Sequence, residues 1–174
     1  MKFHVKKLPS GLRILTVPMT GTEAMTLLVL VGTGSKYESK DQNGISHFLE
    51  HLFFKGTEHR PEAGEVNRAL DRLGSEHNAF TSKELTGYWV KAAAKYFDPA
   101  LDIVSDILLD PLFKADEIER ERGVIIQEIS MYEDMPQRRV GEVFEELLYG
   151  DQPAGWDIAG PKGTIRKITR DQIL

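Results

Sequence analysis

The chain has 174 residues, of which 41% are hydrophobic and 28% are charged, a composition typical of one soluble globular domain. Acidic residues outnumber basic residues by 27 to 22, and the resulting formal charge of −5 argues against nucleic acid as a partner. The sequence contains no cysteine, which excludes disulfide bonds and thiolate metal sites. Any metal must therefore be bound by His, Asp or Glu.

The first residues carry no signal that directs the protein to another compartment. They lack the long apolar segment of a signal peptide and the Arg- and Ser-rich amphipathic pattern of a transit peptide. The longest apolar run, around residues 27–31, is far shorter than the roughly 20 residues that span a bilayer. We therefore expect no membrane contact and a cytoplasmic location.

Predicted strands dominate the first half of the chain. Residues 3–18 indicate a first strand or a hairpin, with a turn at Ser10-Gly11. Residues 24–31 are apolar on both faces, which predicts a central strand that is covered on each side. Two further strands are expected near residues 77–81 and 85–93, where Thr, Tyr, Trp and Val are frequent.

Helix signals, in the form of a capping residue or proline at the start and a glycine or proline at the end, recur along the rest of the chain. They predict helices over residues 44–55, 61–74, 98–111, 116–133 and 136–150, and a last helix that starts at Thr164 or Thr169. Asn43 is the expected N-cap of the first helix, and Asp116 with Glu119 resembles a capping box. Strands followed by helices predict an α+β fold, with helices packed on a mainly antiparallel sheet in two layers.

The segment from His47 to His51, with the pattern HxxEH, is the part of the sequence that points to chemistry. A helix turns about 100° per residue, so His47, Glu50 and His51 share one face and the large apolar residues share the other. Two His residues four apart can bind one Zn²⁺, and Glu50 is well placed to take a proton from water. A solvated polar face is the alternative for such a pair, but HxxEH is also the inverted zinc-peptidase motif.

A catalytic zinc ion needs a third protein ligand, and the long predicted helix offers two candidates. Glu121 and Glu128 are seven residues apart and therefore lie on the same side of that helix, two turns from each other. Glu128 has apolar neighbours, among which a carboxylate is costly unless it is paired or binds a metal. From this segment alone, a position on the solvated stripe of an amphipathic helix remains the alternative.

Three segments together resemble the N-terminal domain of the pitrilysin/insulinase family of zinc metallopeptidases. They are Gly44 to Thr57 around HxxEH, Asn78 to Tyr88, and Glu119 to Ile129. The sequence is most similar to the smaller members related to mitochondrial processing peptidase and to their bacterial counterparts. The match departs from the family at Glu84, where many members have Asp. The three segments occur in order over most of the chain, which argues against the remaining alternative, an unrelated globular domain with a chance HxxEH.

The resemblance assigns a role to each polar residue of these segments. It implies that His47, His51 and Glu128 bind zinc and that Glu50 is the general base. Glu121 matches a second acidic residue that supports catalysis from outside the ligand set.

The resemblance also implies how a peptide substrate is bound. Asn78 and Ala79 match an edge strand whose backbone pairs with extended peptide. Phe54 matches a residue that lines the pocket for the side chain next to the scissile bond, and an ordinary apolar contact is its alternative role. The implied activity is that of a zinc-dependent metalloendopeptidase acting on extended or unfolded peptides. A non-catalytic peptide-binding or scaffolding subunit of the same family is the alternative.

Family members usually contain two or more homologous domains that close like a clamshell. We therefore expect residues 1–174 to form the N-terminal, zinc-binding half, ending before its last strand. The second domain or subunit that completes the chamber is then absent from this chain. On this basis the isolated chain is expected to be weakly active or inactive, and its exposed sheet edge is expected to favour homo-oligomers.

Overall fold

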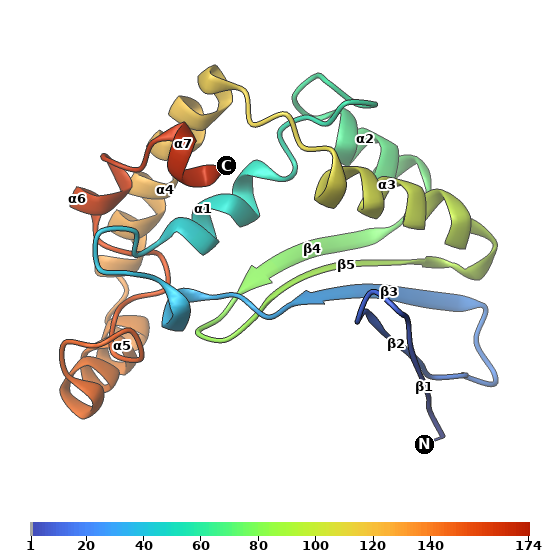
Figure 1. The fold of residues 1–174 in the computed structure, drawn as a ribbon, viewed down its shortest axis with the longest axis horizontal. Helices are drawn as coiled ribbons and strands as arrows, with labels where there is room; N and C mark the ends of the chain where they lie inside the picture. Colours follow the sequence, from blue (N-terminus) through green and yellow to red (C-terminus); the bar gives the residue numbers. More distant parts are fainter. Residues whose placement is uncertain (1) are drawn as a thin grey trace.

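The computed structural model describes residues 2–174, and its centre is a three-stranded antiparallel sheet. The order of the strands is β3 (Ala24–Val31), β5 (Thr86–Ala93) and β4 (Glu76–Thr81). Helices α2 (Glu65–Arg72) and α3 (Phe97–Leu109) cover one face of this sheet (Figure 1). The predicted α+β class, with helices packed on antiparallel strands, is confirmed.

The remaining helices gather at one end of the sheet (Figure 1). They are α1 (Ile45–Leu52), α4 (Ala115–Glu133), α5 (Pro136–Tyr149), α6 (Lys162–Ile165) and α7 (Arg170–Ile173). Short 3₁₀ helices span Ser35–Tyr37 and Ala94–Tyr96. Helix α1 contacts both α4 and β4, and it therefore joins the helical end of the molecule to the sheet. Among residues 2–174, no helix has both the length and the apolar character needed to cross a membrane.

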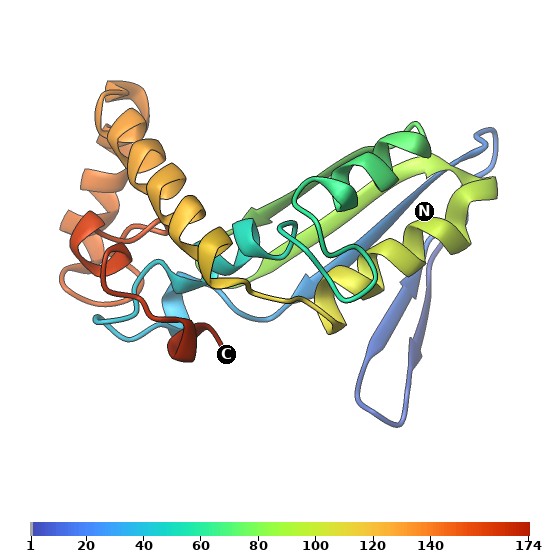
Figure 2. The same cartoon turned by 90° about the horizontal axis from the view of Figure 1, so that it is seen from above.

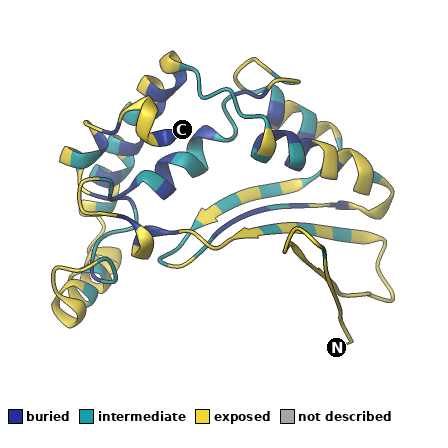
Figure 3. Ribbon diagram, in the orientation of Figure 1, coloured by how far each residue is buried: buried dark blue, intermediate teal, exposed yellow. Residues whose placement is uncertain are grey.

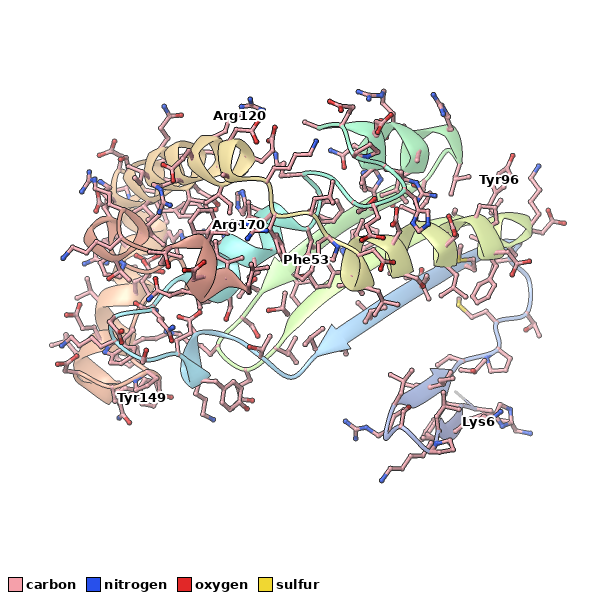
Figure 4. The ribbon with its side chains drawn as sticks, turned by 45° about the horizontal axis from the view of Figure 1, so that its top comes forward. Lys6, Phe53, Tyr96, Arg120, Tyr149 and Arg170 are labelled. Carbon is pink, nitrogen blue, oxygen red and sulfur yellow. The ribbon has the colours of Figure 1, made fainter. Side chains whose placement is uncertain are left out.

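The predicted N-terminal hairpin is present as β1 (His4–Lys7) paired with β2 (Arg13–Thr16). It forms a separate two-stranded sheet, and all eight strand residues are exposed. Figure 2 shows the hairpin projecting away from β3, and Lys6 is labelled on it in Figure 4, apart from the main body of the structure.

The prediction that residues 24–31 form a covered central strand is wrong. β3 lies at an edge of the sheet, and Leu28 and Leu30 on its outer face are about half exposed, at 47% and 55%. The central strand is β5, which has neighbours on both sides and is the most buried strand in Figure 3. An apolar composition shows that a strand can be buried, but it does not determine the position of that strand in the sheet.

Several predicted helix starts also need correction. Gly44, and not Asn43, is the N-cap of α1, and α1 ends at Leu52. Helix α2 begins at Glu65, because residues 62–64 form a bend and turn before it. Asp116 and Glu119 form no capping box, since the side chain of Glu119 pairs with Arg122 instead.

The expectations at the end of the chain are met more closely. Pro136 separates two helices, because α4 ends at Glu133 and Pro136 occupies the first turn of α5. Of the two proposed starts for the last helix, Thr169 is the N-cap of α7. It forms a capping box with Gln172, whereas Thr164 lies inside α6.

Buried apolar side chains form two separate cores. The helical core lies between α1, α4 and the C-terminal segment, and it consists of Phe48, Leu52, Ile118, Ile125, Ile129, Ala159, Ile165, Ile168 and Ile173. The sheet core lies between β5, α2 and α3, and it consists of Val66, Leu70, Tyr88, Val90, Ala100, Ile103, Val104 and Ile107.

Three aromatic rings connect the two cores. Phe53, directly after α1, packs edge-to-face on Tyr88 of the sheet core, with ring centroids 5.4 Å apart. Phe53 also packs on Phe113, with ring centroids 5.5 Å apart, and Phe113 contacts the helical core. Phe53 is labelled at this junction in Figure 4. Among the described residues, Phe113 is the one non-glycine residue with positive φ, at 43°.

Candidate metal centre

The start of α1 is capped by the carboxylate of Glu38, a residue that the sequence patterns did not indicate. Glu38 accepts hydrogen bonds from the backbone N–H groups of Gly44 and Ser46, both at 2.8 Å. The side chain of Asn43 does not cap the helix; it donates to Glu38 and to the carbonyl of Asp157. A carboxylate several residues upstream leaves no local signal, whereas Asn directly before a helix does.

Gly44 is required at this helix start for two reasons. Its φ of 101° belongs to the left-handed region, and a Cβ atom there would lie 2.4 Å from the carbonyl oxygen of Ala159. The first turn of α1 is thus pressed against the C-terminal segment, and the direction in which the helix leaves this contact fixes where its two His side chains point.

The side chains of His47, His51 and Glu128 come together between α1 and α4. The Oε2 atom of Glu128 lies 3.3 Å from Nε2 of His51 and 3.7 Å from Nε2 of His47. Three donors bound to one tetrahedral Zn²⁺ at 2.0–2.1 Å are themselves roughly 3.3 Å apart. Two imidazole nitrogens and one carboxylate oxygen, all within 4.8 Å of one another, therefore fit a zinc ion in number, chemical type and spacing.

Glu121 holds His51 in the orientation that a metal ligand needs. Nδ1 of His51 hydrogen-bonds to Oε2 of Glu121 at 3.2 Å, and this contact turns Nε2 toward Glu128. The other oxygen of Glu121 accepts from Nζ of Lys55 at 2.8 Å. A carboxylate on the distal nitrogen of a metal-binding His fixes its ring and tautomer.

The electrostatics of the two imidazoles differ. Burial lowers the pKa of His47 to about 4, and the neighbouring His51 adds to this effect, so His47 is neutral. Its Nδ1 has no hydrogen-bond partner among residues 2–174. Burial also opposes the charged form of His51, but hydrogen bonds to Glu121 and Glu128 outweigh it and raise its pKa to about 9. The hydrogen bond from His51 is the main reason that the pKa of Glu128 falls to about 2.

Glu50 leaves α1 in a different direction, toward the sheet. Its Oε2 accepts a hydrogen bond from the hydroxyl of Thr81, at the end of β4, at 2.5 Å. Burial raises the pKa of Glu50, and the Thr81 hydrogen bond only partly offsets this. A carboxylate with a raised pKa next to the cluster is suited to accepting and returning a proton.

The residues expected to bind substrate surround a cleft of about 310 Å³ beside the cluster. Phe54, Asn78 and Ala79 line it together with Glu50 and His51. Asn78 and Ala79 belong to β4, which pairs with β5 on one side and is the edge strand on the other. The side chain of Asn78 accepts a hydrogen bond from the N–H of Ala79 at 2.9 Å.

A second group of potential ligands, formed by His59, Asp106 and Asp110, has a structural explanation. The buried carboxylate of Asp106 accepts hydrogen bonds from the hydroxyl of Thr57 at 2.6 Å and from Nη1 of Arg60. His59 bonds to its other oxygen at 2.9 Å. Because Arg60 already neutralises Asp106, this group fastens the 57–60 loop to α3.

Comparison with known proteins identifies the family. The family model for insulinase, peptidase family M16, matches residues 13–162. A Bacillus subtilis protein named as an uncharacterized zinc protease is 37% identical over 164 residues, which cover 94% of this chain and 40% of that protein. The beta subunit of mitochondrial-processing peptidase from Saccharomyces cerevisiae is 41% identical over 170 residues, covering 98% of this chain and 37% of the subunit.

A solved structure agrees in fold as well as in sequence. The crystal structure of a protease from Helicobacter pylori superposes with a TM-score of 0.93 at 30% identity, over 99% of this chain and 42% of that one. The present chain thus spans about two fifths of the length of these relatives. With the family model matching most of its residues, the chain belongs to the insulinase family of peptidases, M16.

Proposed function

We propose that this chain is the zinc-binding domain of a metalloendopeptidase that hydrolyses extended or unfolded peptides. The observation that carries the proposal is the approach of the His47 and His51 imidazoles, from one turn of α1, to the carboxylate of Glu128 on α4. Zinc held by these three residues would supply Lewis-acid chemistry, by lowering the pKa of a water molecule and polarising the peptide carbonyl.

Glu50 would act as the general base. It would accept a proton from the attacking water and return it to the leaving amine, for which its raised pKa is suited. Its position beside His51 in the cleft, and on the side of α1 that faces β4, supports this role. Glu121 would contribute indirectly, by fixing the ring of His51.

The edge of β4 would bind the substrate. An extended peptide adding to this edge gains main-chain hydrogen bonds that depend little on its sequence, and Asn78 would release the N–H of Ala79 to it. Phe54 would contact the side chain next to the scissile bond, since it lines the same cleft as Glu50.

We further propose that a second, homologous domain or subunit completes the active chamber. The share of its relatives that this chain covers supports this view. So does the cleft, which one domain leaves open to solvent. The isolated chain should then bind zinc but cleave peptides weakly or not at all.

Two measurements test the proposal in sequence. Atomic absorption should find one zinc ion per chain after dialysis against trace metal, and none in the Glu128→Gln variant. Cleavage of an unfolded peptide should then appear when the domain is combined with its second domain or subunit. A wild-type chain that binds no zinc would overturn the metal centre. A chain that binds zinc but gives an inactive complete assembly would favour the non-catalytic peptide-binding role.

A further inference from the structure

One turn beyond Glu128 on α4, Tyr132 contacts the carboxylate from the side away from the imidazoles. The hydroxyl of Tyr132 donates a hydrogen bond to Oε1 of Glu128, whereas Oε2 is the atom that faces His47 and His51. The two oxygens of this carboxylate therefore have different partners, one a phenol and the other the pair of imidazoles.

Tyr132 is itself held in place from the neighbouring helix. The guanidinium of Arg138, in the first turn of α5, lies over the Tyr132 ring at 3.2 Å from its centroid. Glu142 accepts a hydrogen bond from Nε of Arg138 at 3.0 Å and another from Arg139 at 3.2 Å. A cation stacked on the face of an aromatic ring stabilises one ring orientation. The position of the hydroxyl is therefore set from α5.

The difference between the two oxygens matters for a zinc ion. A catalytic zinc site has three protein ligands and keeps a further position open for water or substrate. A free carboxylate can bind through one oxygen or through both, and the second mode would use the open position. A hydrogen bond to an ionised carboxylate is among the stronger ones in proteins, so a donor on Oε1 competes with that second mode.

We propose that Tyr132 is a positioning residue that makes Glu128 a ligand through Oε2 alone, with Arg138 fixing the ring that carries the hydroxyl. This inference rests on the zinc-binding function proposed above. It adds a role for two residues outside the HxxEH segment and its distant Glu, and it gives the first turn of α5 a task at the metal centre.

The test uses Tyr132→Phe, which removes only the hydroxyl and keeps the ring under Arg138. Zinc affinity, measured by competition with a chromophoric chelator, should fall about 10–100-fold, as for other groups that orient a ligand. In the Co²⁺-loaded protein, the visible absorption should weaken, because tetrahedral Co²⁺ absorbs more strongly than Co²⁺ with additional ligands. The melting temperature of the metal-free variant should stay close to that of the wild type.

Three further variants separate a positioning role from general damage to the fold. Tyr37→Phe removes an exposed hydroxyl elsewhere and should change neither zinc affinity nor the Co²⁺ spectrum. Arg138→Ala should weaken zinc binding less than Tyr132→Phe, and Arg138→Lys, which keeps a cation, should restore part of the loss.

The outcomes distinguish this inference from the proposed function. If the wild type binds zinc, Glu128→Gln loses it, and Tyr132→Phe matches the wild type in affinity and Co²⁺ spectrum, the role of Tyr132 is wrong and the metal centre stands. If Tyr132→Phe lowers only the melting temperature, the hydroxyl serves packing alone and the inference fails. If the wild type binds no zinc, both proposals fall.

Discussion

Helix α1 contacts both α4 and the sheet, and different polar side chains of α1 face each of them. Toward α4 it presents His47 and His51, whose partners Glu121 and Glu128 belong to the helical end of the molecule. Toward the sheet it presents Glu50, whose partner is Thr81 at the end of β4. The residues proposed for metal binding are therefore held by α4, and the residue proposed for proton transfer is held by β4. Substitutions should be able to change zinc affinity without changing proton transfer, and the reverse.

The strongest test of this separation is Glu128→Gln, which removes a charge and a ligand atom on the α4 side. We expect zinc affinity to fall by well over the ~10–100-fold typical of residues that only orient a ligand. Chelator competition measures the change. Glu119→Gln, an exposed position on the same helix, is the matched control and should bind zinc normally. Retention of zinc at wild-type affinity by Glu128→Gln would show that the carboxylate is not a ligand.

Glu50→Gln should have the opposite pattern. Zinc content should be unchanged, whereas peptide cleavage by the complete assembly should fall by roughly 10²–10⁴-fold, the contribution typical of a general base. Glu76→Gln, on the exposed start of β4, controls for the loss of a carboxylate. Undiminished cleavage by Glu50→Gln would remove it from the mechanism.

The pH dependence of zinc binding should follow the titration of a single group, His51. Zinc competes with the proton on His51, whose pKa is about 9, while His47 and Glu128, with pKa values of about 4 and 2, have lost their protons by neutral pH. Affinity should therefore rise with pH by about tenfold per unit, between about pH 6 and 9, and then level off. Calorimetry in buffers with different ionisation enthalpies should detect one proton released per zinc at pH 7. An affinity independent of pH over this range would contradict the assigned His51 environment.

Thr81→Val should give the smallest effect, because it removes only the hydrogen bond that β4 donates to Glu50. Loss of one hydrogen bond to Glu50, worth ~1 kcal/mol, predicts about a fivefold decrease in cleavage with normal zinc affinity. Because this bond lowers the pKa of Glu50, its removal should also shift the acidic limb of the pH–rate profile to higher pH. Thr26→Val, on the exposed face of β3, is the control. A matching decrease in zinc affinity would mean that the contact of Glu50 with β4 also influences the metal-binding residues.

The local parts of this arrangement could be predicted from the sequence. The four-residue spacing places His47 and His51 on one face of a helix, and the seven-residue interval places Glu121 and Glu128 on one side of α4. Both rules involve only residues within two helical turns. The turn of Glu50 toward the sheet does not follow from this spacing. The approach of α1 to α4 was implied by the family resemblance, because no local rule brings two distant helices together.

The parts that depend on non-local neighbours were missed. β3 has an apolar composition but lies at an edge, since strand order depends on pairing across the chain. Glu38 takes the capping role expected of Asn43 because the preceding loop folds back onto α1. The hydroxyl of Thr81 on Glu50 and that of Tyr132 on Glu128 left no signal, because a single hydroxyl has no characteristic spacing from its partner.

The row of rings formed by Tyr88, Phe53 and Phe113 bears on motion within the domain. It spans the junction just beyond the last turn of α1, so a hinge opening between the helical and sheet cores would have to separate rings that pack edge-to-face. Phe113 maintains this row despite a left-handed backbone, a conformation that costs of order 1–3 kcal/mol for a residue other than glycine. Strain at that position is thus tolerated where it keeps the two cores from moving apart, and with them Glu50 on α1 from Thr81 on β4.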